Sequence, residues 1–210
     1  MIILPAEENV ADVYKLMIGL IVPRPIAFVS TCAMDGVLNL APFSYFTAVS
    51  ANPPVVCFCP MIRSSDGCPK DTLKNIEATK EFVINIVSEE IAERMNACSF
   101  DYPPGVDEFR VSGLTPVASD NVQPPRVAEA KASMECRLHQ IVHVSRKPLG
   151  GSVVLGEVVR FHVQDSLIED FRIDPGQLRA IGRMGGPVYT RTTDRFEMPR
   201  PTAPAFGTKR

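Results

Sequence analysis

The sequence predicts a mainly β fold with flanking helices, and three observations lead to that prediction. Many short apolar, β-branched runs follow one another with tight turns between them. Only two or three segments show helical spacing, whereas a parallel α/β sheet needs a helix between most strand pairs. No Gly-x-Gly-x-x-Gly segment occurs, so a dinucleotide-binding doubly wound sheet is not expected. The pattern therefore favours a closed antiparallel barrel.

The first quarter of the chain predicts one helix and a series of strands. A helix is expected at residues 8–19, where Asn9 can cap the first turn and apolar side chains recur at helical spacing. Asp35-Gly36 is a turn dipeptide typical of a hairpin. The strand-like runs in this part occupy residues 25–34, 37–42, 43–51 and 55–60.

Two more helices and one strand follow. Asp71 or Thr72 can cap a helix that runs to about Lys80. Residues 82–87 are apolar and β-branched, which predicts a strand. Residues 88–98 begin with Ser-Glu-Glu and carry apolar side chains at helical spacing, which predicts an amphipathic helix.

The second half of the chain predicts a long loop and two long strands. Residues 101–127 are rich in Pro, Gly, Asp and Ser, which is typical of a surface excursion that could act as a lid or binding loop. Long strands are expected at residues 133–145 and 152–163. The Pro-rich tail, about residues 199–210, is expected to be extended and ordered only against a partner surface. With no internal repeat, residues 1–210 read as a single domain.

Charge and composition limit the partners and the location. The formal net charge is −2, which argues against a nucleic-acid partner. No run approaches the roughly 18 apolar residues that cross a bilayer, so no membrane span is expected. The N-terminal segment meets acidic residues at once and does not read as a secretory signal. The six scattered cysteines read as reduced thiols, and the expected location is cytoplasmic.

Two segments together suggest a flavin site. Residues 39–46 place polar side chains between apolar neighbours, which suits a flat, amphipathic ligand. Residues 63–65 and 70–72 supply cations and hydroxyls near a helix start, where phosphate binds well. A flat-ring pocket with a phosphate site suggests flavin mononucleotide (FMN). No His or Cys is placed for a covalent link, so noncovalent binding is expected.

A set of ordered motifs spans roughly residues 21–163. The motifs are Arg24-Pro-Ile-Ala-Phe-Val-Ser-Thr, Asn39-Leu-Ala-Pro-Phe-Ser-Tyr-Phe, Asn52-Pro-Pro-Val-Val, Lys70-Asp-Thr-Leu-Lys-Asn-Ile, Glu81-Phe-Val-Ile-Asn, Glu135-Cys-Arg-Leu and Gly156-Glu-Val-Val. Together they resemble the flavin reductase-like family, which includes reductase components of two-component flavoprotein monooxygenases and flavoredoxin-type proteins. The resemblance implies an antiparallel, Greek-key-like FMN-binding split β-barrel and a homodimer. It also implies NADH or NADPH as electron donor, and an oxygenase or electron-transfer protein as partner.

The resemblance also implies which residues hold the flavin. The backbone of residues 43–47 would meet the polar edge of the ring, with hydroxyls from Ser44 and Thr31. Arg63, Ser64, Lys70 and Thr72 would lie toward the phosphate, and which of the two cations dominates stays open. The full set of expected cofactor-binding residues is Thr31, Asn39, Ala41, Pro42, Phe43, Ser44, Tyr45, Phe46, Thr47, Arg63, Ser64, Lys70, Thr72 and, in the later Arg183-Met-Gly-Gly-Pro-Val-Tyr segment, Tyr189.

The favoured function is an NAD(P)H-dependent flavin reductase. Hydride passes from the nicotinamide to flavin N5, so no catalytic side chain is assigned. No metal site is expected, because His139 and His143 would lie roughly 13 Å apart along a strand and His162 lies on another strand. Two alternatives stay open. One is an FMN electron carrier of the flavoredoxin type, and the other is a dimeric binding module without a cofactor.

Overall fold

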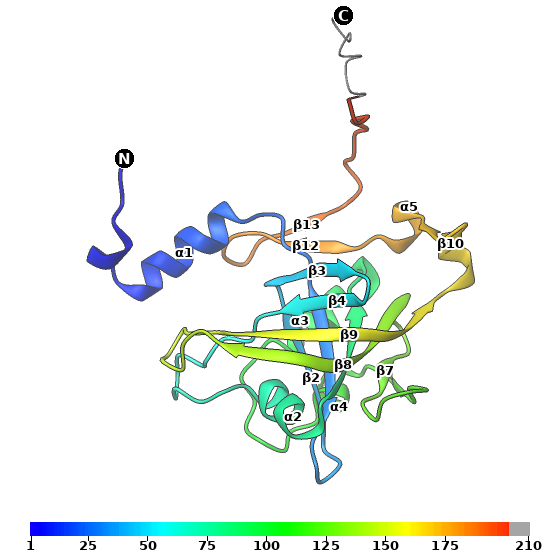
Figure 1. Ribbon diagram of the computed structural model, residues 1–210, viewed down its shortest axis with the longest axis horizontal. Helices are drawn as coiled ribbons and strands as arrows, with labels where there is room; N and C mark the ends of the chain where they lie inside the picture. Colours follow the sequence, from blue (N-terminus) through cyan, green and yellow to red (C-terminus); the bar gives the residue numbers. More distant parts are fainter. Residues whose placement is uncertain (202–210) are drawn as a thin grey trace, which may run out of the picture.

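A seven-stranded antiparallel sheet forms the centre of the computed structural model, which describes residues 1–201 (Figure 1). Its strands lie in the order β2-β1-β5-β8-β9-β4-β3, and every pairing within it is antiparallel. The predicted mainly β, antiparallel fold is therefore confirmed. The strands are β1 (Ala27–Cys32), β2 (Leu38–Phe43), β3 (Phe46–Ala51), β4 (Pro54–Phe58), β5 (Glu81–Ile86), β8 (Ala132–His143) and β9 (Ser152–Val163).

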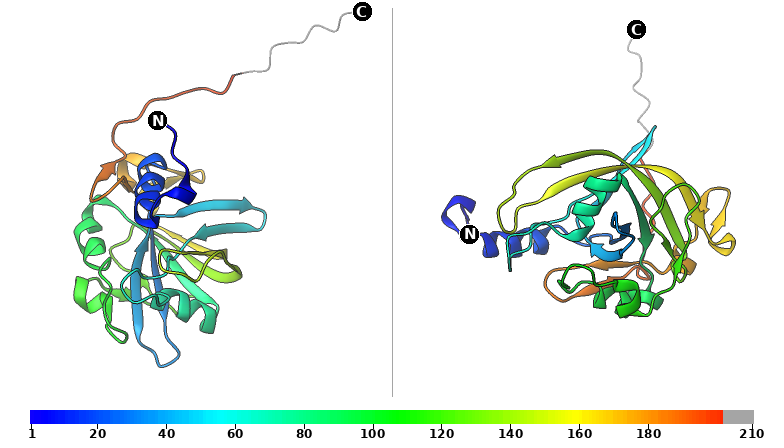
Figure 2. Two further views of the ribbon diagram at one scale, coloured as in Figure 1. Left: turned by 90° about the vertical axis from the view of Figure 1, so that its left-hand side faces the viewer. Right: turned by 90° about the horizontal axis from the view of Figure 1, so that it is seen from below.

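The barrel is split between β2 and β3. The sheet curls strongly on itself (Figure 2), but the pairings among residues 1–201 end at these two strands. The closed barrel favoured by the sequence pattern alone is thus wrong, and the split form is present. Only Ser44 and Tyr45 separate β2 from β3 along the chain. These two residues therefore mark the place where the chain crosses from one edge of the sheet to the other.

The two faces of the sheet carry separate apolar clusters. Phe43, Phe58 and Phe82 fill one cluster, and helix α2 (Asp71–Thr79) covers it with Leu73 and Ile76. The other cluster lies against the strands' opposite face and is covered by α3 (Ala92–Ala97) and α4 (Glu108–Ser112). Successive β1 residues alternate between the two clusters, as the period of two in a strand requires. Both faces of β1 are therefore buried.

Helix starts agree only partly with the sequence. The helix expected at 8–19 is α1 (Val10–Leu20), and the Asn9 side chain caps it by accepting from the N–H of Asp12, as predicted. The prediction that Asp71 or Thr72 caps α2 is wrong. The N-cap position is Lys70, which makes no side-chain cap bond, and Thr72 is buried inside the first turn.

The remaining elements are short and lie at the periphery. The segment 101–127, expected as a loop, contains α4 and two short strands. About three residues of the expected C-terminal tail fall in the described part, and 202–210 lie outside it. The short elements are η1 (Pro5–Glu7), η2 (Glu89–Ile91), η3 (Asp165–Leu167), α5 (Pro175–Leu178), β6 (Pro116–Val117), β7 (Arg126–Val127), β10 (Ile168–Glu169), β11 (Arg172–Ile173), β12 (Ile181–Arg183) and β13 (Tyr189–Arg191).

The N-terminal helix and the C-terminal hairpin lie side by side above the split. In Figure 1, α1 extends away from the barrel at upper left, and β12–β13 crosses the same level. An isolated bridge between Arg24 and Arg183 joins the two segments. In residues 1–201, no helix is both long enough and apolar enough to span a bilayer.

Candidate functional site

Two adjoining cavities lie beside β2. The first, called the cation cavity here, is lined by Asn39, Ala41, Arg63, Lys70 and Thr72, together with the 98–102 loop. The second, called the Ser44 cavity, has a volume of about 180 Å³. It is lined by Arg24, Ser44, Arg183 and Tyr189, with apolar walls from Ile18, Ile26 and Met95. Pro42 and Ser99 border both, so the cavities are neighbours. Eight of the expected site residues, counting Pro42, thus line one continuous region.

A buried polar network holds the floor of the cation cavity. Thr72 and Thr31 both donate their hydroxyls to Asn39 Oδ1, at 2.6 and 3.2 Å. The Asn39 amide in turn donates to the carboxylate of Glu108, at 3.0 Å and 3.1 Å. Burial raises the pKa of the Glu108 carboxyl, and the backbone N–H of Leu40, bonded to it at 3.0 Å, works in the opposite direction. Thr31 is fully buried and lines neither cavity, so its hydroxyl positions Asn39.

Both expected phosphate cations are paired with carboxylates. Arg63 lies 2.9 Å from Asp66, and Lys70 lies 2.5 Å from Asp101 in the loop after α3. An anionic ligand in this cavity must therefore displace these carboxylates from the two cations, or share the cations with them. Ser64, which was expected beside them, is exposed and lines neither cavity.

Arg24 organises the Ser44 cavity, and the sequence assigned it no role. It is 4% exposed, and its Nε donates to Ser44 Oγ at 3.3 Å. Its other nitrogens donate to the carbonyl oxygens of Ile18 and Ile21, both at 2.6 Å, and of Met184 at 2.9 Å. Because Ser44 accepts from Arg24, its own hydroxyl proton is free to be donated to a ligand. Ser44 and Met184 lie 20 and 160 residues away from Arg24, so no local pattern in the sequence signalled this role.

The β12–β13 hairpin brings Arg183 onto Tyr189. The two residues are direct partners in the hairpin, and the guanidinium lies 4.4 Å from the centre of the tyrosine ring. The Tyr189 hydroxyl donates to Asn96 Oδ1 at 3.0 Å. The side chain is thus fixed at both ends. The 183–189 segment, which lies more than 130 residues after Ser44 in the sequence, therefore borders the Ser44 cavity.

The aromatic side chains of the 43–47 segment belong mainly to the core. Phe43 is buried, with its ring centre 5.0 Å from that of Phe58. Phe46 packs against the same cluster. Tyr45 is half-buried, and its ring lies 5.9 Å from the Arg24 guanidinium. Thr47 is exposed on β3. None of these four residues of the segment lines the cation cavity or the Ser44 cavity.

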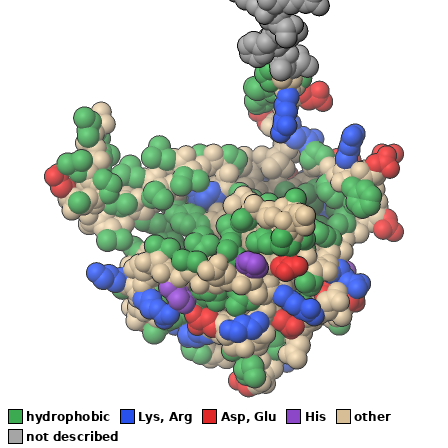
Figure 3. Space-filling view, in the orientation of Figure 1, with side chains coloured by type: hydrophobic (Ala, Val, Ile, Leu, Met, Phe, Trp, Pro, Cys, Tyr) green, Lys and Arg blue, Asp and Glu red, His purple; other side chains and the backbone are tan. Residues whose placement is uncertain are grey.

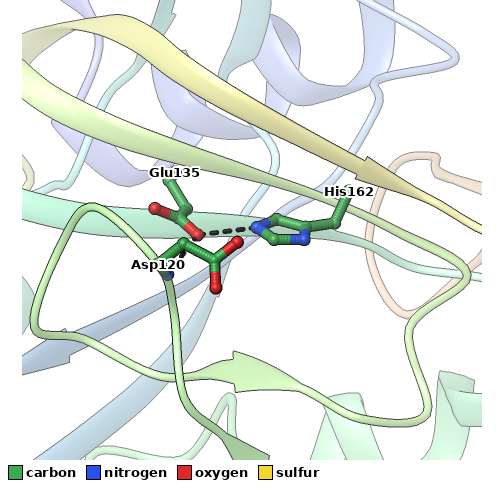
Figure 4. Close-up of side chains that lie close together, drawn as sticks. All are labelled: Asp120, Glu135 and His162. Atoms are coloured by element: carbon green, nitrogen blue, oxygen red, sulfur yellow. Dashed lines mark hydrogen bonds and ion pairs between the residues drawn. The ribbon is translucent and has the colours of Figure 1, made fainter.

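A third cluster joins Asp120, Glu135 and His162, away from the two cavities (Figure 4). Glu135 is fully buried and accepts from His162 Nε2 at 2.6 Å. It also accepts from the backbone N–H of Asp120 at 2.8 Å and of Asn121 at 2.7 Å. Burial opposes its ionisation, yet these donors hold the pKa of Glu135 below its usual range. Asp120 is paired with Arg160 at 2.7 Å. These contacts describe a structural carboxylate that fixes the 118–121 loop.

Comparison with known proteins gives a consistent result. The family model described as "Flavin reductase like domain" matches residues 19–180. The chain is 44% identical over 186 residues to a protein of Aquifex aeolicus (strain VF5), covering 88% of this chain and 92% of the relative.

Two solved structures are similar over almost the whole chain. One is nitrilotriacetate monooxygenase component B from Bacillus cereus, at 36% identity and a TM-score of 0.89, covering 94% of this chain and 98% of that one. The other is the 2-nitrobenzoate 2-nitroreductase NbaA from Pseudomonas fluorescens, at 34% identity and a TM-score of 0.87, covering 99% and 100%.

Proposed function

The chain belongs to the flavin reductase-like family, and from that premise we propose that it binds FMN noncovalently and reduces it with NADH or NADPH. Family membership supports an oxidoreductase reaction on a flavin. The observation that carries the finer proposal is the pair of adjoining cavities at the split between β2 and β3. One is lined by cations and the other by a free hydroxyl donor and apolar walls.

The donors in the two cavities fit the two ends of FMN. In the cation cavity, Arg63 and Lys70 lie beside the N-terminal end of α2, whose first-turn N–H groups favour an anion. In the Ser44 cavity, the Ser44 hydroxyl can donate to a ring carbonyl, and Pro42 and Ile18 supply apolar contact. We therefore assign the phosphate to the first cavity and the isoalloxazine ring to the second.

The chain's own residues orient the reactants and favour charge on the ring. FMN, when bound, supplies the hydride-accepting chemistry. Arg24 and Arg183 place two guanidinium groups around the Ser44 cavity, and their field favours a ring that gains negative charge. Tyr189, held by Asn96 and Arg183, forms a flat wall against which an aromatic donor can stack. No acidic or basic side chain is required for the transfer.

Anaerobic stopped-flow mixing of the FMN-loaded protein with NADH or NADPH tests the proposal. The oxidised flavin band is expected to bleach, with a Michaelis constant of tens to hundreds of micromolar as an order of magnitude. Denaturation should release the flavin from the chain. Failure to bind added FMN would contradict the proposal outright.

The same experiment separates the reductase from an electron carrier. Persistence of the oxidised band for minutes with both donors, while dithionite bleaches it, would favour the carrier of the flavoredoxin type. Likeness to a monooxygenase component B supports an oxygenase as the consumer of reduced flavin. A cofactor-free binding module would be the remaining explanation if no flavin binds, and the arrangement of Ser44, Arg63, Lys70 and Thr72 argues against it.

We also propose a homodimer in a reducing cytoplasm. Hydrophobic side chains gather along α1 and on the surface beneath it (Figure 3). Among them, Val10, Met17 and Leu20 are exposed, the last at 81%. A second copy that covers this helix would remove the apolar surface from water. All six cysteines are unpaired, which supports a reducing compartment.

A further inference from the structure

A third cavity, of about 400 Å³, lies beside Tyr189. It is called the Glu93 cavity here. It is formed between η2–α3 on one side and the β12–β13 hairpin on the other. Its lining includes Glu89, Glu93, Asn96, Ile181, Tyr189 and Arg191. Tyr189 also lines the Ser44 cavity. A ligand that stacks in the Ser44 cavity can therefore extend past this ring into the third cavity.

The charges in the Glu93 cavity are unevenly paired. Glu89 is neutralised by Arg179 at 2.8 Å and by Arg191 at 3.1 Å. Glu93 is exposed and forms no ion pair with any residue of 1–201. Arg191 uses Nε for Glu89, and its side chain is otherwise largely exposed. The cavity thus offers one free carboxylate and one guanidinium that can still donate.

We propose that the Glu93 cavity binds the adenosine diphosphate part of the electron donor, and that Glu93 makes the protein prefer NADH to NADPH. The inference rests on the proposed function, because the nicotinamide must first stack in the Ser44 cavity. A carboxylate accepts hydrogen bonds from both hydroxyls of an unmodified ribose. A guanidinium suits the diphosphate. Ile181 and Ala92 supply apolar contact for the base.

The 2′-phosphate of NADPH is what the free carboxylate would reject. A dianion a few ångströms from Glu93 is repelled. Arg191, the cation in the lining, is already shared between Glu89 and the diphosphate, so it offsets this repulsion only in part. One such repulsion at intermediate dielectric changes affinity by about tenfold. The expected preference for NADH is therefore tenfold or more in the Michaelis constant.

The test compares the wild type with Glu93→Gln, Arg191→Ala and the control Glu169→Gln, all loaded with FMN. Glu169 is an exposed carboxylate of β10 that does not line the cavity. Calorimetric titration with ADP-ribose and its 2′-phosphate measures binding without any redox step. Stopped-flow reduction measures the Michaelis constants for NADH and NADPH.

We expect wild type and Glu169→Gln to bind ADP-ribose about tenfold tighter than its 2′-phosphate. Glu93→Gln should reduce that difference to about threefold or less, chiefly because the variant binds the 2′-phosphorylated ligand more tightly. Arg191→Ala should weaken both ligands severalfold. FMN affinity should stay unchanged in all three variants, which separates a local effect from misfolding.

Two outcomes would overturn the inference while leaving the reductase intact. One is rapid flavin reduction with equal constants for NADH and NADPH. The other is ADP-ribose binding that neither Glu93→Gln nor Arg191→Ala alters, or that is absent at millimolar ligand. Failure of the proposed function gives a different result, since the flavin would then not be reduced by either donor.

Discussion

Arg24 links three parts of the chain to the candidate flavin site. Its guanidinium donates to the end of α1, to the 184 loop and to Ser44. The bond to the Ile18 carbonyl is buried and those to Ile21 and Met184 are half-buried, so loss of the guanidinium leaves acceptors that water replaces incompletely. The residue therefore acts on stability and on the site at once.

Arg24→Met tests this role. We expect a loss of about 3 kcal/mol, because one buried and two half-buried carbonyl oxygens are left without their donor. For a chain of this size that lowers the melting temperature by roughly 6–12 °C. Thermal unfolding followed by circular dichroism measures it. Arg24→Lys should recover only part of the loss, because one ammonium cannot reach all three carbonyl oxygens. A full recovery would show that charge alone matters.

The phosphate cations give a second prediction at this scale. A charge-assisted contact contributes on the order of 1.5–3 kcal/mol, so Lys70→Ala or Arg63→Ala should weaken FMN binding about ten- to hundredfold. Riboflavin, which has no phosphate, should lose far less. Fluorescence titration with both ligands makes the comparison. Equal losses of affinity for FMN and riboflavin would mean that these residues stabilise the fold and do not contact the phosphate.

For single residues, the sequence indicated which residue types could contact a ligand, but it did not indicate which side chains hydrogen-bond to one another. Lys70, Arg63 and Ser44 could be selected because cations, hydroxyls and apolar neighbours occur together. Arg24 and Glu108 could not, because their partners lie up to 160 residues away and only the fold brings them together. Ser64 was selected from the same local run, but it is exposed and lines neither cavity.

The 98–102 loop forms one wall of the cation cavity. Asp101 forms an ion pair with Lys70 at 2.5 Å, so a phosphate in the cavity competes with a carboxylate for the same ammonium. Asp101→Asn should therefore strengthen FMN binding severalfold, in the opposite direction to Lys70→Ala. The same fluorescence titration measures it. Weaker binding in Asp101→Asn would mean that the loop supports the bound flavin instead.

Strand β8 carries a pH-dependent contribution to stability through the buried carboxylate of Glu135. The pKa of Glu135 is held below its usual range. Its stabilising effect is therefore present above its unfolded pKa, about 4.5, and is lost as the pH falls through the lower folded value. Glu135→Gln should cost about 2–4 kcal/mol at pH 7 and less near pH 3. Urea unfolding at several pH values checks this. An equal loss at both pH values would contradict it.

Strands with two apolar faces or clear alternation were predictable, and so was α1, whose cap is local. The α2 cap was missed because Thr72 turns inward to Asn39. The short elements α4, β6 and β7 were missed for a related reason. They depend on distant contacts, such as the bond from the Val127 N–H to the buried Asn85 side chain, more than on their own sequence.

For the whole molecule, the exposed face of α1 predicts association. Leu20→Asp, combined with Met17→Asp, should convert a dimer to a monomer at micromolar concentration, because two charges would lie in the apolar contact. Phe171→Asp is the matched control. Phe171 is 98% exposed at the β10–β11 turn, far from α1 along the chain. Sedimentation velocity distinguishes the two results. A monomeric wild type that still binds FMN would contradict the prediction.

The pairing of β4 with β9 has a consequence for the time course of folding. Val55 lies opposite Glu157, about a hundred positions further along the chain. During synthesis, the β3–β4 hairpin forms early but has no neighbouring strand until β9 has left the ribosome. Its β4 edge exposes unpaired backbone groups through that interval. Closure of such a long loop is slow, so this last docking step should set the folding rate, on a millisecond-to-second scale.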